Sequence, residues 1–192
     1  MNIKELIVAF IRRGKPFDDQ GKDAVGIGAY MPLNEVAKWK PRWKIEKYAD
    51  DETCRAGTPN EVLEFDGNLL LNEGINAIWT LVCGGSETAF SNANARIGVG
   101  DSNVAEAATQ TDLQAATNKL YKVMDAGYPT FGTNQKVTFR STFGATEANW
   151  AWNEITVDNG SVALKNLNRK VQVMGTKANP ATWVVTLEIT LS

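Results

Sequence analysis

The residues of this chain that could carry out acid–base chemistry are carboxylates, because the sequence contains no histidine. Histidine is the commonest general base and the commonest ligand for transition metals. Two pairs of carboxylates are available that could serve glycosidic bond cleavage: Asp101 with Glu106, and Glu147 with Glu154. We interpret them instead as a turn carboxylate and solvated sheet positions, since carboxylate pairs are common by chance and gain meaning only from their separation.

Two short motifs resemble ligand-binding sites but lack required residues. The segment Asp101–Glu106 offers oxygen ligands, but it has no glycine at the sixth position and no glutamate at the twelfth of a calcium loop. We interpret it as a turn in which Asp101 and Asn103 bond their own backbone. Gly98 and Gly100 are not a dinucleotide fingerprint, because a third glycine and a following helix are missing. The sequence therefore predicts no catalytic residue, no metal, no cofactor and no enzyme activity.

Basic and aromatic residues are interleaved over residues 38–44, a pattern found in proteins that bind single-stranded nucleic acid. The acidic residues Glu35 and Glu46 dilute this charge, and the net charge of the chain is −2. Phosphate binding normally requires a basic excess, so we expect no nucleic acid partner. We favour a segment that lies on an acidic protein surface, with Trp39 and Trp43 among its contacts.

Trp150 and Trp152 share one face of a predicted strand. Aromatic side chains on a half-buried sheet either fill the core or anchor an interface, and the sequence does not separate the two interpretations.

Cys54 and Cys83 lie in a polar loop and at the end of an apolar run, respectively. We expect free thiols in a reducing compartment rather than a disulfide, because a dense cysteine framework is absent. The apolar start Met1–Ile11 is interrupted by Glu5 and is not followed by a cleavage site. It is also shorter than the roughly 20 apolar residues of a membrane span, so we expect synthesis in the cytoplasm and no membrane partner.

The positions of these residues depend on the elements around them, which begin with a short helix. Residues Asn2–Arg13 carry an apolar stripe at helical spacing, formed by Ile3, Leu6, Ile7 and Phe10. A helix of about three turns is marginal alone, so the stripe requires a partner. From Gly14 to Arg42, repeated glycine and proline predict an extended arm. We therefore place the domain boundary between the arm, residues 1–42, and a body, residues 43–192.

The body is predicted to be mainly β. The last residues, Thr182–Leu191, place apolar side chains at every second position, which only a strand brings to one face. Asn68 is a candidate N-cap for a helix over residues 68–83. The other strands are expected at Trp43–Glu46, Glu61–Phe65, Ala95–Val99, Lys119–Met124, Lys136–Phe143, Trp150–Val157 and Asn168–Met174. This succession predicts an antiparallel β-sandwich, immunoglobulin-like or jelly-roll-like, with one packed helix.

Four stretches of the body carry a resemblance to known proteins. They are Gly67–Gly74, Ile97–Ser102, Thr109–Leu113 and Asn168–Val171, the last followed by the turn at Gly175–Lys177. In this order and spacing they resemble a family of small structural proteins of tailed bacteriophages, over about residues 61–192. The resemblance implies a β-sandwich component of the virion and a role in assembly.

We expect a non-enzymatic virion protein that decorates or cements the head. Its partners would be the major capsid protein, other virion proteins and copies of itself, since many copies on a symmetric shell turn weak contacts into strong ones. The expected partner contacts are Ile3, Leu6, Ile7, Phe10, Trp39, Trp43 and Trp152. Two alternatives stay open: a tail, collar or fibre component, and a surface carbohydrate-binding module in which Trp152 stacks on sugars.

Overall fold

The computed structural model describes residues 38–160 and 164–192. The predicted N-terminal helix, with Ile3, Leu6, Ile7 and Phe10, and most of the predicted arm lie outside the described residues.

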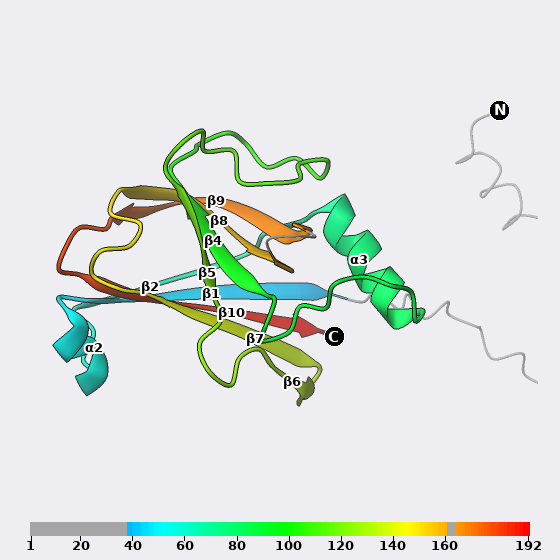
Figure 1. The fold of residues 1–192 in the computed structure, drawn as a ribbon, viewed down its shortest axis with the longest axis horizontal. Helices are drawn as coiled ribbons and strands as arrows, with labels where there is room; N and C mark the ends of the chain where they lie inside the picture. Colours follow the sequence, from blue (N-terminus) through cyan, green and yellow to red (C-terminus); the bar gives the residue numbers. More distant parts are fainter. Residues whose placement is uncertain (1–37, 161–163) are drawn as a thin grey trace, which may run out of the picture. The chain divides into compact units, whose positions relative to one another are not determined.

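Ten strands and two helices make up the described part of the chain (Figure 1). The helices are α2 (Asp51–Ala56) and α3 (Asn72–Val82). The strands are β1 (Trp39–Tyr48), β2 (Glu61–Asp66), β3 (Leu69–Leu70), β4 (Arg96–Gly100), β5 (Lys119–Val123), β6 (Thr130–Thr133), β7 (Lys136–Phe143), β8 (Ala151–Asp158), β9 (Asn166–Thr176) and β10 (Thr182–Leu191). They form a first sheet with the order β2-β1-β10-β7-β6 and a second sheet with the order β3-β9-β8-β4-β5. All described pairings are antiparallel, so the predicted β-sandwich is confirmed.

Strand β10 lies in the middle of the first sheet, as its alternating apolar residues require. It pairs with β1 on one side and with β7 on the other. Leu187 is opposite both Trp43 and Phe139, and all three side chains are buried in the core. Because successive residues of a strand point to opposite faces, the same register leaves threonines and charged residues on the outer face.

Aromatic residues of both sheets meet in the centre of the core. The ring of Trp152 on β8 makes edge-on contacts with Phe143 and Trp183, at centroid distances of 4.8 Å and 4.7 Å. The Trp152 indole also donates a hydrogen bond to the carbonyl of Ala148 at 2.8 Å. Edge-to-face aromatic pairs of this kind add to the stability that burial alone provides.

The first sheet begins four residues earlier than predicted. We expected the arm to continue to Arg42, but β1 starts at Trp39, which is opposite Leu191. Pro41 is compatible with this strand because its carbonyl accepts a hydrogen bond from the amide of Gly67, beyond the end of β2. Proline has no amide hydrogen, and at Pro41 such a hydrogen would point to the same side as the carbonyl. Strand β2 has already ended there, so no β2 residue needs a hydrogen-bond donor from Pro41.

Helix α3 begins later than predicted. Leu69 and Leu70 pair with β9 as the short strand β3, and Leu71 precedes the helix without a side-chain cap. Asn68 therefore does not cap α3; its side-chain oxygen accepts a hydrogen bond from the Trp39 indole at 3.1 Å. Neither described helix combines the length and the apolar character that crossing a bilayer requires.

Candidate functional site

Ionisable and hydrogen-bonding side chains gather on the outer face of the second sheet. This face is covered by residues 101–118, the covering loop, which connects β4 to β5. The side chains come from β4, β5, β8 and β9, and each reaches the covering loop or a neighbouring strand. The sequence alone does not indicate this arrangement, because the paired residues lie far apart along the chain.

Glu154 on β8 and Arg169 on β9 form the centre of this network. Their side chains are fully buried, and the closest nitrogen–oxygen distance between them is 2.7 Å. The carboxylate of Glu154 also accepts hydrogen bonds from the backbone amides of Gln114 at 2.9 Å and Ala115 at 2.7 Å. Arg169 donates to the side chain of Gln110 at 3.0 Å. The charge of Arg169 thus balances that of the Glu154 carboxylate, and the hydrogen bonds from the two amides hold the covering loop in place.

Tyr121 and Asp112 form a second part of the network. The Tyr121 hydroxyl donates to Asp112, and the Lys119 ammonium lies 2.6 Å from the same carboxylate. Burial raises the pKa of Asp112, but the hydrogen bonds from Lys119 and Tyr121 outweigh burial and hold the pKa below its usual value. Burial and the neighbouring Asp112 carboxylate raise the pKa of Tyr121. Tyr121 therefore stays protonated and acts as a hydrogen-bond donor.

Arg96 and Asp158 form a third ion pair at the edge of this region. Asp158 is fully buried, and both of its carboxylate oxygens accept hydrogen bonds from Arg96. The guanidinium also lies 4.8 Å from the centre of the Tyr121 ring, in a cation–π contact. Burial raises the pKa of Asp158, while Arg96 opposes that shift. The pair joins β4 to β8 with one charge of each sign.

The two glycines of β4 have a packing role in this network. A Cβ atom at Gly98 would lie 2.5 Å from a ring carbon of Tyr121, and a Cβ atom at Gly100 would collide with the carboxylate of Glu154. Glycine is used here because another group approaches the backbone closely.

The carboxylates considered as catalytic pairs have separate roles. Asp101 accepts a hydrogen bond from Asn118 at 2.7 Å, and Glu106 accepts one from the amide of Val171 at 2.6 Å. Glu147 forms an ion pair with Lys122 at 2.5 Å, whereas Glu154 belongs to the buried pair with Arg169. Within residues 38–160 and 164–192, no group of three or more His, Cys, Asp or Glu side chains is placed to hold a metal ion.

Two tryptophans expected at a partner surface lie in the core instead. Trp43 and Trp152 are fully buried, and Trp39 is partly buried against the core. The expectation of partner contacts at Trp43 and Trp152 is therefore corrected: both point inward because alternate residues of β1 and β8 face the opposite sheet. The interleaved basic residues face outward, where Arg42 pairs with Glu64 and Lys44 with Glu46.

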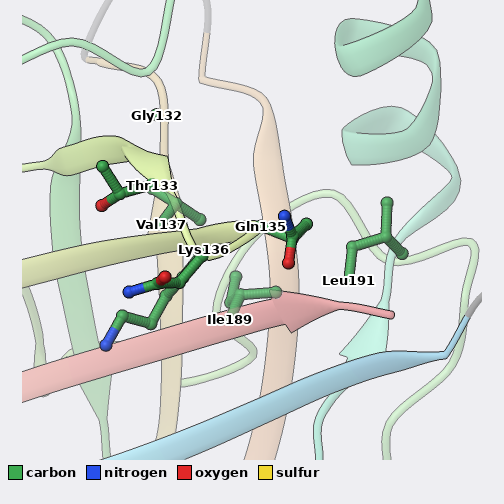
Figure 2. Close-up of a pocket in the computed structure, with 8 residues that line it drawn as sticks. Gly132, Thr133, Gln135, Lys136, Val137, Ile189 and Leu191 are labelled. Atoms are coloured by element: carbon green, nitrogen blue, oxygen red, sulfur yellow. The ribbon is translucent and has the colours of Figure 1, made fainter.

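A shallow groove of about 470 Å³ lies at the turn between β6 and β7, next to the end of β10 (Figure 2). Its apolar lining comes from Val137, Ile189 and Leu191, and its polar lining includes Gln135 and Lys136. Lys136 is already paired with Glu188 at 2.8 Å. These groups can receive an apolar side chain and offer amide hydrogen bonds.

The most exposed apolar side chains were not among the residues predicted from the sequence. Phe131 on β6 is 75% exposed, Val82 on α3 and Val173 on β9 are each 69% exposed, and Trp79 on α3 is 62% exposed. In Figure 1, α3, β6 and the C-terminus lie toward the same end of the sandwich. The sequence signal was present in α3, which carries more apolar residues than one buried stripe requires.

The two cysteines are free thiols, as predicted. Cys83 is exposed directly after α3, and Cys54 on α2 is partly buried, which raises the pKa of its thiol.

Comparisons with protein-family models, curated proteins and solved structures found no match to this chain.

Proposed function

We propose that this chain is a non-enzymatic structural protein of a tailed-bacteriophage virion, and that it decorates the head by binding the major capsid protein and neighbouring copies of itself. The observation that carries the proposal is the contrast between two kinds of residue. The buried ion pairs and their hydrogen bonds hold the sandwich together internally, whereas large apolar side chains on α3 and β6 remain exposed. That combination suits a rigid body that acts through contacts.

The internal network supports a rigid body in particular. The Glu154 carboxylate, the Arg169 guanidinium and the amides of Gln114 and Ala115 are all engaged with one another. The covering loop is therefore fixed to the sheet by buried, charge-assisted hydrogen bonds. A subunit that is repeated many times in a shell requires such a defined surface, because each copy must present the same contacts.

The exposed apolar residues support contact with protein. Interface centres are enriched in aromatic residues and depleted of charge. Trp79 and Phe131 are aromatic side chains on the surface of two separate elements, α3 and β6. The resemblance of residues 61–192 to phage structural proteins adds the virion as the assembly in which these contacts form.

The N-terminal residues form the second part of the proposed contact. The apolar stripe of Ile3, Leu6, Ile7 and Phe10 would bind the shell or a neighbouring subunit. The described body starts at Lys38, whose backbone exchanges hydrogen bonds with that of Ser192. A variant that lacks residues 1–36 therefore separates the contribution of the N-terminal segment from that of the body.

The copy number of the chain in purified virions tests the proposal. Quantitative mass spectrometry relative to the major capsid protein is expected to give hundreds of copies for head decoration. A small multiple of three or six would point to the tail or collar instead, and absence from the particle would refute the proposal. If the variant without residues 1–36 still binds at full occupancy, the N-terminal segment is not part of the contact, and the body makes the contact alone.

A further inference from the structure

Lys177, directly after β9, is a buried lysine without a charged partner. It is 1% exposed, and its side-chain nitrogen donates to two neutral acceptors, the carbonyl of Gly144 at 2.7 Å and the side-chain oxygen of Asn149 at 3.1 Å. The other buried charges of the described residues belong to the ion pairs of the second sheet, whereas Lys177 forms none. We propose that Lys177 and Asn149 join through an isopeptide bond, which forms within the folded chain without any other protein.

The carboxamide of Asn149 is held with its oxygen toward the nitrogen of Lys177. Its own nitrogen donates to the carbonyl of Ala145 at 2.9 Å. Because a lysine can only donate and a carbonyl can only accept, these two contacts fix which end of the carboxamide faces Lys177. The backbone holds the pair as well, since the amide of Lys177 donates to the carbonyl of Trp150, the residue after Asn149, at 3.0 Å. Two groups that are kept together in this way react far faster than the same groups free in solution.

The surroundings of Lys177 favour the uncharged amine, which is the reactive form. Burial lowers the pKa of Lys177, and the carboxylates of Glu147 and Asp51 oppose that shift only in part. A lysine that is removed from water in this way is the form in which the side chain acts as a nucleophile. Asn149 is exposed, so the ammonia that the reaction releases can reach the solvent.

The reaction exchanges one amide bond for another, so it needs no oxidant, reductant or cofactor. The lone pair of the uncharged Nζ of Lys177 attacks Cγ of Asn149, and the bond between Cγ and Nδ2 breaks. One proton passes from Nζ to Nδ2, which leaves as ammonia. Glu147 is the one acid–base group of residues 144–150 and can carry this proton. Its carboxylate accepts a hydrogen bond from the amide of Gly144 at 2.9 Å, and the carbonyl of the same glycine binds Lys177.

The bond would link the end of β9 to the residues that precede β8. It closes a loop over residues 149–177, and a closed loop limits the conformations of the unfolded chain, so the linked form should unfold at a higher temperature than the unlinked form. This inference goes beyond the proposed function, because it concerns covalent chemistry within one chain and holds whether or not the chain belongs to a virion.

Mass spectrometry of the full, folded chain tests this inference. We expect the intact chain to be lighter than its sequence by one molecule of ammonia, and the linked fraction to grow during incubation at about pH 9, where more of the lysine is uncharged. Trypsin cannot cleave after a lysine whose side chain is acylated. The digest should therefore contain the peptides 141–165 and 171–192 joined to each other.

Variants of the two partners provide the controls. Asn149→Ala and Lys177→Met should keep their full mass, and circular dichroism should show that Asn149→Ala is folded, since its side chain is exposed. Asn76→Ala is the matched control, because it removes another exposed asparagine, on α3, and should still lose ammonia.

Two results would overturn the inference. The first is a folded wild-type chain that keeps its full mass after the incubation. The second is a loss of ammonia without the joined peptides, as a succinimide at Asn159, which precedes Gly160, would give.

Discussion

The guanidinium of Arg169 and the carboxylate of Glu154 lie 2.7 Å apart, and neither side chain is exposed to solvent. The pair joins neighbouring strands β8 and β9, and the same carboxylate binds two amides of the covering loop. A long segment without regular structure thereby becomes part of the rigid body. A buried ion pair is costly to form but far more costly to break, because one charge is then left unpaired in the interior.

Replacing Glu154 by glutamine should destabilise the domain by about 3–5 kcal/mol, because Arg169 would remain buried without a counter-charge. Chemical denaturation measures the loss, and hydrogen exchange should show faster exchange at the amides of Gln114 and Ala115. Glu64→Gln is the matched control, since it breaks the solvent-exposed pair with Arg42 and should have a far smaller effect. Equal losses in the two variants would contradict the central role of the buried pair.

Two carboxylates near the covering loop should respond to pH in opposite directions. The pKa of Asp112 is held below its usual value, so its ionised form stabilises the folded state at neutral pH, and that contribution should be lost as the pH falls below about 4. Burial raises the pKa of Glu73, so its ionised form weakens the fold, and acidification should relieve this penalty.

The comparison of two variants measures this difference. The stability advantage of the wild type over Asp112→Asn should shrink on acidification from pH 7 to pH 3. Relative to Glu73→Gln, the wild type should instead gain stability over the upper part of that range. If the two stability differences change with pH in the same direction, the pKa values of Asp112 and Glu73 are not shifted in opposite directions.

Most of the regular structure could be predicted because it is encoded locally. Alternation of apolar residues predicted the bounds of β7 and β10 as the structure has them, and those of β2, β4, β5, β8 and β9 to within two residues, whereas β1 starts four residues before its predicted start. The failures occurred where local signals were short or ambiguous. Strand β6 has only four residues between Pro129 and a turn, and α2 lies within a segment that resembles a loop.

The polar network could not be predicted, because its contacts join distant residues. Gln114 and Glu154 are 40 positions apart, and no periodic pattern relates them. The role of Trp152 was undecided for a different reason. A strand places its residues on two faces, but the sequence does not say which face meets the other sheet when both carry aromatic and polar residues.

The corrected start of the body leads to a prediction about truncation. The chain without residues 1–36 should keep the thermal stability of the body, because Lys38 and all of β1 remain. Removal of residues 1–42 should lower the stability of the body by about 2–4 kcal/mol. This deletion removes four residues of β1 that pair with β10, including Trp39 and its hydrogen bond to Asn68. If both truncations unfold at the same denaturant concentration, β1 does not begin where the structure places it.

Trp152 and Trp79 offer the sharpest comparison between a structural and a surface aromatic residue. Trp152→Ala should destabilise the domain by about 3–5 kcal/mol, because it empties a site between Phe143 and Trp183. Trp79→Ala should change stability by no more than about 0.5 kcal/mol, since most of its side chain is already in water. Denaturant unfolding at low protein concentration measures both.

The comparison also bears on the carbohydrate-binding alternative, because loss of glycan binding in Trp152→Ala would reflect unfolding of the core. If Trp152→Ala proves as stable as the wild type, its indole is not part of the core, and a surface role for this residue becomes tenable again.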